Sequence, residues 1–316
     1  MTDHRDGRSG PAASVAGPRL LAGSPIAAEI RAGLVGDFAR FKERWGYSPT
    51  LAVVLVGADA PSAVYLGQIL KTCEKVGAQG RLVEIGSNVT PDGLCDEIEK
   101  LNADPAVAGI IVQMPLPAHI PLHSVIDSID PAKDIDGIHP RNAGLLSLGY
   151  DGFLPATAQA AVEILKRSGV KIEGKRVVVV GRSNVVGKPV ALLLIREHGT
   201  VTVLHSRTRD LAHHTRDAEI LVVAAGRPGL VTGAMLSPGV VVVDVGINVV
   251  SDGKGGERLV GDVDFESAKG VMSAITPVPG GVGPLTNALL LSHLLRAATD
   301  QAELSARLRR VAARDD

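Results

Sequence analysis

Short runs of valine, isoleucine and leucine alternate along the chain with longer segments whose apolar residues recur at helical spacing. A short apolar run that ends at glycine or polar residues predicts a strand buried on both faces, and helical periodicity predicts an amphipathic helix. The expected strands are 51–56, 81–85, 108–112, 177–180, 200–204, 220–224, 240–243 and 271–275. The expected helices are 26–38 (capped by Ser24), 61–76, 91–101, 155–167, 190–195, 288–298 and 302–313. This alternation predicts an α/β fold with parallel sheets, in two halves separated by the polar loop Lys133–Gly144.

The segment Val177–Pro189 predicts the strand, turn and helix that open a dinucleotide-binding fold. Its valines form the strand, Gly181 ends it, and Gly187 precedes the helix. Glycines there let the backbone approach a pyrophosphate at the positive end of a helix. The spacing is G-x-S-x-x-x-G rather than G-x-G-x-x-G, so the segment alone is also compatible with an ordinary turn between a strand and a helix.

Composition narrows the classes of protein. The chain has 316 residues, enough for two domains, and only 3% are aromatic, which favours a core of small aliphatic side chains. A net charge of −1 without a basic stripe argues against nucleic-acid binding, and no apolar run predicts a membrane span. Cys73 and Cys95 lack metal-ligand spacing, which favours a cytoplasmic protein without a metal site. Residues 1–17 lack the apolar core of a signal peptide and are predicted to be a disordered extension.

The residues after the strand 200–204 bear on the choice of cofactor. In dinucleotide-binding folds a carboxylate at this position binds the adenosine ribose of NAD, whereas basic and hydroxyl residues suit the 2′-phosphate of NADP. The chain has Ser206 and Arg207 there and no carboxylate, and Arg182 lies in the first turn. We therefore expect NADP rather than NAD; the alternative is that both arginines are solvated loop residues.

The run Pro277–Thr286 is too rich in proline and glycine for a core element. We expect a rigid loop that contacts a ligand, with a structural linker as the alternative. Its segment PGGVGPLT (279–286) resembles the C-terminal signature of the methylenetetrahydrofolate dehydrogenase/cyclohydrolase family. The segments GIIVQMPLP (109–117), KDIDG (133–137), GRSNVVGKP (181–189) and DVGIN (244–248) resemble other motifs of that family, in the same order.

This resemblance implies two three-layer α/β domains flanking a cleft, the second a Rossmann-type NAD(P)-binding domain. It places a folate-binding catalytic domain at 18–155, completed by a C-terminal helix at 288–313, and an NADP-binding domain at 156–287. The implied substrate is a tetrahydrofolate derivative, and the implied assembly is a homodimer paired through the nucleotide domain.

The resemblance also implies roles for individual residues. Tyr65 matches the tyrosine that stacks on the pterin, Gln113 the glutamine beside the catalytic lysine, and Asp136 the aspartate that holds the nitrogen edge of the pterin. The implied catalytic positions are Tyr65, Gln113, Asp136 and the lysine position, and the implied folate contacts are Ser62, Tyr65, Gln113, Asp136, Pro279, Gly280 and Gly281. The implied dinucleotide contacts are Thr157, Gly181, Arg182, Ser183, Ser206, Arg207, Ile247 and Thr286.

One position departs from the family pattern. The catalytic lysine of the family follows the tyrosine as Y-x-x-x-K, and Ile69 stands at that position here. Lys71 points about 120° away from Tyr65 on a helix, so it cannot take the lysine's place. We hypothesise that oxidation of methylenetetrahydrofolate is kept, because it depends mainly on positioning, whereas the cyclohydrolase step is weak or absent because it needs proton transfer.

Three other functions compete with this hypothesis. The chain is a full bifunctional enzyme if another group or a water molecule does the work of the lysine. It is a folate-dependent one-carbon transfer or binding protein if it performs no redox turnover, although the nucleotide motif argues against this. A two-domain dehydrogenase acting on hydroxy acids is disfavoured by the QMPLP, KDIDG and PGGVGPLT segments.

Overall fold

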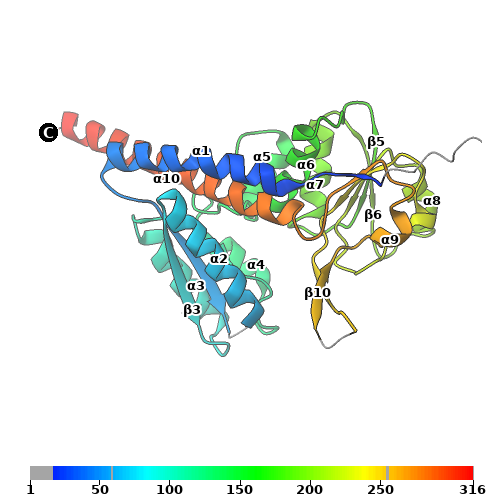
Figure 1. Ribbon diagram of the computed structural model, residues 1–316. Coiled ribbons are helices and arrows are strands. Elements are labelled where there is room, and N and C mark those ends of the chain that lie inside the picture. The colour runs from blue at the N-terminus through cyan, green and yellow to red at the C-terminus, as the bar shows by residue number, and fades with distance from the viewer. Residues whose placement is uncertain (1–16, 58–59, 254–255, 316) are drawn as a thin grey trace, which may run out of the picture.

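The structure is a computed structural model that describes residues 17–57, 60–253 and 256–315 (Figure 1). It contains two parallel sheets with helices on both faces, which confirms the predicted pair of α/β domains. Within the described residues, no helix is long and apolar enough to cross a membrane. No three His, Cys, Asp or Glu side chains of this part of the chain gather into a group that would hold a metal ion.

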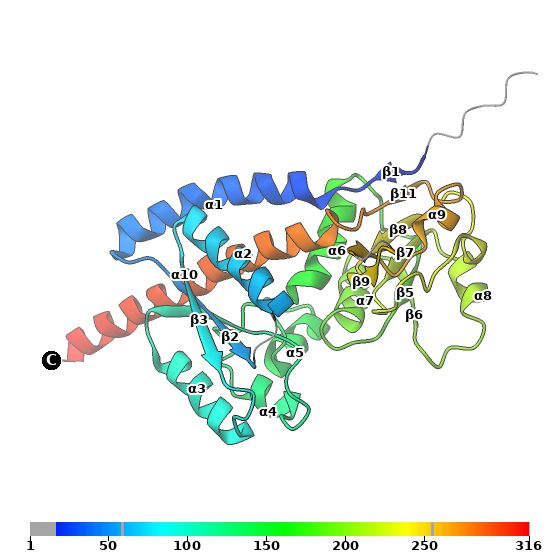
Figure 2. The same cartoon turned by 60° about the horizontal axis from the view of Figure 1, so that its bottom comes forward.

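The first domain is built on the sheet β3-β2-β4. Alternate residues of β2 point to opposite faces, so Leu51 and Val53 pack in one core cluster and Ala52 and Val54 in another. Figure 2 shows α2 on one face of the sheet and α3 on the other. The elements are α1 (Gly23–Trp45), β2 (Thr50–Val56), α2 (Ala60–Val76), β3 (Gln79–Ile85), α3 (Pro91–Ala103), β4 (Val107–Val112) and α4 (Leu122–Asp127).

The second domain is built on a six-stranded sheet in the order β1-β11-β8-β7-β5-β6. The chain leaves β5 to form β6 on one side and β7 on the other, which creates the switch point where ligands bind in such sheets. Its strands are β1 (Arg19–Leu20), β5 (Arg176–Val180), β6 (Thr200–Leu204), β7 (Ile220–Val223), β8 (Val241–Asp244) and β11 (Ala274–Ile275). In the chain, α5 (Pro140–Leu148) lies between the two sheets. The helices and hairpin around the second sheet are α6 (Ala156–Arg167), α7 (Gly187–Arg196), α8 (Leu211–Arg216), η1 (Gly233–Met235), β9 (Asn248–Ser251), β10 (Glu257–Val260) and α9 (Phe265–Ala268).

The long helix α10 (Val282–Asp315) joins the two domains. Leu285 and Leu289 pack into the core that contains α6 and α7, whereas Leu290 and Leu294 pack into the core of the first domain. Figures 1 and 2 show α1 running beside α10 along this connection. One continuous helix therefore belongs to both cores, and this fixes the orientation of one sheet relative to the other.

Three expectations about local structure are wrong. The helices expected at 288–298 and 302–313 are one helix, because Thr299 stays helical with its hydroxyl bonded to the carbonyl of Leu295. This helix starts at Val282, so the second half of the expected loop Pro277–Thr286 is helical; Pro284 is tolerated because it lies in the first turn. Ser24 does not cap α1, which begins at Gly23; its hydroxyl donates to the carbonyl oxygen of Gly280.

The strand β1 has no counterpart among the expected elements. It pairs with β11 and therefore lies in the larger sheet, although the sequence assigns residues from 18 onward to the first domain. A strand of two residues has no hydrophobic period to detect, and only its neighbour in the sheet defines it.

Candidate active site

The motif around Gln113 continues directly from β4 at the carboxyl end of the first sheet. The amide N–H of Gln113 donates to the carbonyl of Val54, which holds the residue beside the end of β2. Its half-buried side chain donates from Nε2 to the carbonyl of Met114, 2.8 Å away. Parallel α/β sheets bind their ligands at this edge, so the predicted position of Gln113 suits a binding role.

The charged side chains of the Lys133–Gly137 segment fall into two groups: those that hold the loop in place, and one that is not engaged by other described residues. The buried Lys133 ammonium donates to the carbonyls of Leu101, Asn102 and Asp104 at 2.7–3.1 Å, at the end of α3. The buried Asp134 carboxylate accepts from the amides of Ile138 and His139 and from Asn142, all at the start of α5. Both side chains therefore hold the loop in place and are occupied in doing so.

Asp136 is the member of this segment that remains available. Its carboxylate is half-buried and forms no hydrogen bond to a side chain or amide that the structure describes. Burial, and secondarily the charge of Asp134, raises the pKa of Asp136 to about 7. The carboxyl group therefore changes its charge near neutral pH, which is a property typical of functional sites.

A buried histidine supports the loop from α10. His293 Nδ1 lies 2.8 Å from the carbonyl oxygen of Ile135, and Nε2 lies 2.9 Å from the amide of Gln159 on α6. Burial lowers the pKa of His293 to about 4, so the ring is neutral and carries one N–H. Nδ1 then donates to Ile135, and the Gln159 amide must turn its NH₂ group toward Nε2. The helices α6 and α10 are thus joined next to Asp136.

Ile69 lies on α2 with 5% of its surface exposed, in the cluster that also contains Leu66, Cys73 and Ile135. Lys71 is exposed, and the ammonium of Lys133 is engaged at the end of α3, so neither supplies a free ammonium in this cluster. Ser62 and Tyr65 belong to α2, but their side chains lie outside the described part of the chain, so their predicted roles remain predictions.

The first half of the expected loop, Pro277–Gly281, is irregular in the structure, as expected. The carbonyl of Gly280 accepts from the amides of Gly23 and Ser24 at 3.0 and 3.2 Å, which ties the loop to the start of α1. Gly280 has a φ of 110°, and a Cβ added to Gly281 would lie 2.7 Å from the carbonyl oxygen of Pro277. This turn therefore favours glycine at position 280 for its backbone conformation and at position 281 for lack of space.

A cavity of about 320 Å³ lies at the carboxyl ends of β5, β6 and β7. Four predicted cofactor contacts line it, namely Gly181, Arg182, Ser183 and Ser206. The hydroxyl of Ser183 accepts from the amides of Val186 and Gly187, so it shapes the start of α7. The other lining residues are Val180, His205, Thr208, Leu211, Ala224, Ala225, Arg227 and Leu230.

The remaining predicted cofactor contacts do not line this cavity. Arg207 and Ile247 are exposed, and the hydroxyl of the buried Thr286 donates to the carbonyl of Val282 within α10. Thr157 is half-buried in the first turn of α6. Conversely, Arg227 lines the cavity but is not among the residues predicted from the sequence. It follows the strand β7, whereas the prediction considered only the glycine turn and the end of β6.

Replacement of Gly181 by alanine should strongly weaken dinucleotide binding. Gly181 has a φ of 132°, and an added Cβ would lie 2.1 Å from the carbonyl oxygen of Ala224, so the two walls of the cavity must move apart. We expect the dissociation constant measured by calorimetry to rise at least about 100-fold, which corresponds to about 3 kcal/mol. Gly33→Ala on the exposed face of α1 is the control, since nothing lies within 4 Å of its added Cβ. Unchanged binding in Gly181→Ala would mean that this turn does not contact the cofactor.

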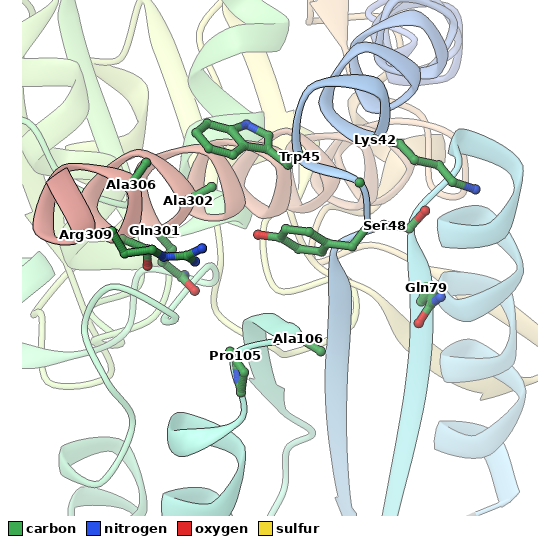
Figure 3. Close-up of a pocket in the computed structure, with 13 residues that line it drawn as sticks. Lys42, Trp45, Ser48, Gln79, Pro105, Ala106, Gln301, Ala302, Ala306 and Arg309 are labelled. Carbon is green, nitrogen blue, oxygen red and sulfur yellow. The ribbon is translucent and has the colours of Figure 1, made fainter. Parts of the chain in front are cut away.

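A larger groove lies at the opposite end of the first sheet (Figure 3). Its volume is about 780 Å³, and Trp45, Tyr47, Gln79 and Arg309 are among its lining residues. Gln79 begins β3, so the groove lies at the amino edge of the sheet, about 20 Å from the carboxyl edge along a strand of this length. None of the predicted site residues that the structure describes lines this groove, so it is separate from them.

The fold and the two carboxyl-edge sites define a two-domain α/β protein with a Rossmann-type nucleotide domain. Residues 21–136 match the family described as "Tetrahydrofolate dehydrogenase/cyclohydrolase, catalytic domain". Residues 155–302 match "Tetrahydrofolate dehydrogenase/cyclohydrolase, NAD(P)-binding domain". The chain belongs to this family of enzymes, which confirms the family resemblance of its motifs.

Relatives and solved structures agree with this assignment. The chain is 48% identical over 280 residues to the "Bifunctional protein FolD" of Geobacillus thermodenitrificans, covering 89% of this chain and 97% of the relative. The FolD structure from Campylobacter jejuni is 42% identical with a TM-score of 0.84, covering 89% of this chain and 98% of its own. The Trypanosoma brucei enzyme, solved with NADP and an inhibitor, is 39% identical with a TM-score of 0.86, covering 90% of this chain and 98% of its own.

Proposed function

We propose that this protein is an NADP-dependent methylenetetrahydrofolate dehydrogenase whose methenyltetrahydrofolate cyclohydrolase activity is weak or absent. The family assignment supports the first part. The observation that carries the second part is Ile69, a nearly buried aliphatic residue where the family's catalytic lysine is expected. We expect the folate to be bound by Ser62, Tyr65, Gln113, Asp136 and the loop 279–281. We expect the nucleotide to be bound in the cavity beside Gly181.

The cavity at the ends of β5, β6 and β7 fits NADP by its chemistry. Its glycine turn leaves no room for a Cβ, and its lining contains two arginines and neither aspartate nor glutamate. When bound, NADP accepts the hydride that leaves the one-carbon bridge of the folate. The protein holds the folate next to the nicotinamide. The ionised Asp136 carboxylate accepts hydrogen bonds from the pterin, and Tyr65 stacks on the pterin ring. These roles are compatible with a reaction that depends on positioning.

Hydrolysis of the methenyl product makes a different demand. Water must be deprotonated as it adds to the cation, and a positioned acid or base contributes about 10²–10⁴-fold to such a step. The isoleucine side chain transfers no proton. Gln113 donates to its neighbour Met114, and the Lys133 ammonium is fully engaged, so neither takes the place of the lysine. In this proposal the Asp136 carboxylate is occupied by the pterin and does not act on the water.

The test is to assay both steps on the purified protein. With methylenetetrahydrofolate and NADP, we expect NADPH to form in equal amount to methenyltetrahydrofolate, which then accumulates. Supplied methenyltetrahydrofolate should disappear only at the rate of the buffer. Rapid hydrolysis would establish the full bifunctional enzyme, the function that the names of the relatives favour. Tight folate binding without NADPH formation would instead establish a folate-binding or one-carbon transfer protein.

We also propose a homodimer in the cytoplasm. The hairpin β9–β10 extends away from the second sheet (Figure 1) and exposes apolar side chains at Val249 and Leu259, with Ile247 just before it. Exposed apolar residues on a projecting hairpin suit pairing between two copies through the nucleotide domain. The cytoplasmic location is proposed from the sequence, because Cys73 and Cys95 lack the spacing of a disulfide or metal motif. Light scattering of the purified protein should give twice the mass of the chain, and the mass of a single chain would contradict the dimer.

A further inference from the structure

The loop that follows β7 is held by one buried carboxylate. Asp262 has no exposed surface, and it accepts hydrogen bonds from three consecutive backbone amides. Its Oδ2 accepts from Ala225 at 2.6 Å and Gly226 at 2.8 Å, and its Oδ1 accepts from Arg227 at 2.9 Å. Three bonds from successive amides to one charged group fix the path of this loop more tightly than a turn in solvent would.

Asp262 is itself fixed from two other sides. Its Oδ1 also accepts from Asn248 Nδ2 at 2.9 Å, at the start of β9, and its backbone amide donates to the carboxylate of Asp244 at the end of β8. A Cβ added to Gly246 would lie 2.3 Å from Asp262 Cγ, so the carboxyl group is also confined sterically. Each carboxylate oxygen accepts two hydrogen bonds, and the group therefore acts as a structural anchor for the loop.

The anchored loop forms one wall of the cofactor cavity. Ala225 and Arg227 line the cavity from β7, while Arg182 lines it from the turn after β5. Both arginines are exposed, and neither forms an ion pair with another described side chain. Two arginines thus line a cavity that also contains Ser206 from the end of β6, and no carboxylate lines it, which suits a phosphate group on the adenosine ribose.

We propose that Arg227 is a further cofactor-binding residue that contacts the 2′-phosphate of NADP, and that Asp262 is the positioning residue that delivers it. The proposal rests on the proposed NADP dependence and adds a determinant of the choice between NADP and NAD. Asp262 fixes the backbone amide of Arg227, and hence the point from which the guanidinium enters the cavity. Loss of either residue should therefore weaken the binding of the 2′-phosphate far more than the binding of the rest of the dinucleotide.

The first test is Arg227→Gln, with NADP and NAD binding measured by calorimetry on the intact protein. We expect NADP to bind about 10- to 100-fold more weakly, as for the loss of a charge-assisted hydrogen bond, and NAD to bind within about twofold of the wild type. Arg196→Gln is the matched control, because it removes the same charge from the exposed far end of α7. An unchanged affinity for NADP, or equal losses for NADP and NAD, would overturn the role of Arg227.

The second test is Asp262→Asn, which retains the size of the side chain but replaces one acceptor oxygen by an NH₂ group. That NH₂ group must face amide donors, so the loop should shift. We expect at least a 10-fold rise in KM for NADP, with KM for the folate unchanged and a cooperative unfolding transition. The double variant should bind NADP no more weakly than the weaker single variant, because both act through one contact. Fully additive losses, or equal losses for NAD, would reduce Asp262 to a general structural role and overturn the proposal.

These measurements separate the proposal from the proposed function. Binding of NADP and NAD is measured without folate, so a protein that binds NADP through Arg227 but does not oxidise methylenetetrahydrofolate contradicts only the proposed function. A protein that oxidises methylenetetrahydrofolate with NADP, but whose Arg227→Gln variant binds NADP as tightly as the wild type, contradicts only the proposal about Arg227 and Asp262.

Discussion

An Ile69→Lys variant should hydrolyse methenyltetrahydrofolate about 10²- to 10⁴-fold faster than the wild-type protein. The backbone of α2 places residue 69 on the face that meets the core cluster containing Ile135, the residue before Asp136. A lysine has an apolar stem that packs as isoleucine does, and it carries its ammonium beyond the space that the isoleucine side chain fills. Partial burial lowers the pKa of a lysine, which brings it closer to the range where it exchanges protons at neutral pH.

The matched control for this gain is Ile69→Met. Methionine has a similar length but no ionisable group, so it should leave hydrolysis at the wild-type level while the dehydrogenase persists. The lysine variant should also melt at a lower temperature than the methionine variant, since a charge enters a site with 5% exposure. If the lysine variant folds, oxidises methylenetetrahydrofolate and still does not hydrolyse the product, then residue 69 is not the cause of the missing activity.

The sequence located most of the regular elements because their cores are runs of one residue type. The valines of β5 and β7 and the apolar runs of β2 and β4 are buried on both faces, and such runs stand out against the polar turns between them. The expected bounds of these strands agree with the structure to within about one residue. The short helices α4, α5, α8 and α9 were not predicted, since elements of four to nine residues depend on tertiary contacts more than on their own pattern.

The site residues that lie in sequence motifs were predictable from the sequence. The contacts between residues far apart in the sequence were not. Gln113 directly follows the expected strand 108–112, so the sequence could assign it to the carboxyl edge of a sheet, whereas Asp136 was assigned only through the family resemblance of its motif. The sequence could not show that Lys133 holds the loop while Asp136 is free to bind a ligand, because the partners of Lys133 lie 29–32 residues away. The bond between Asp262 and Arg227 spans 35 residues and joins two loops, so only the folded chain shows that they act together.

Replacement of Asp136 by asparagine should stabilise the protein at high pH. Its folded-state pKa of about 7 is raised from 3.8, primarily by burial, so the folded protein retains a proton that the unfolded chain has lost. The contribution of this group to the unfolding free energy is thus highest below about pH 4 and falls as the pH rises toward 7. The asparagine side chain carries no charge to desolvate, and we expect the variant to gain about 1–3 kcal/mol over the wild type at pH 8, discounted for partial exposure. Urea unfolding at pH 4 and pH 8 measures this, and the difference should vanish at pH 4.

Asp134→Asn is the control, and it should change the free energy of unfolding in the opposite direction. Its buried carboxylate accepts three hydrogen bonds from the start of α5, and an amide cannot satisfy all of them, so this variant should be less stable than the wild type at pH 8. A loss of stability at pH 8 in Asp136→Asn as well would mean that Asp136 holds the loop as Asp134 does, and would contradict its assignment as the available carboxylate.

The same Asp136→Asn change should lower kcat/KM for methylenetetrahydrofolate about 100-fold at pH 8, through the loss of charge-assisted hydrogen bonds. The ionised carboxylate accepts from the N–H groups of the pterin, whereas the amide presents an NH₂ group to other donors. The wild-type kcat/KM should therefore rise with pH through about 7, where Asp136 ionises, and that rise should be absent in the variant. A stabilised variant that keeps the wild-type kcat/KM and its pH profile would remove Asp136 from the folate site. Greater stability with lower activity would instead show that the buried carboxylate is retained at the expense of stability because the folate requires its charge.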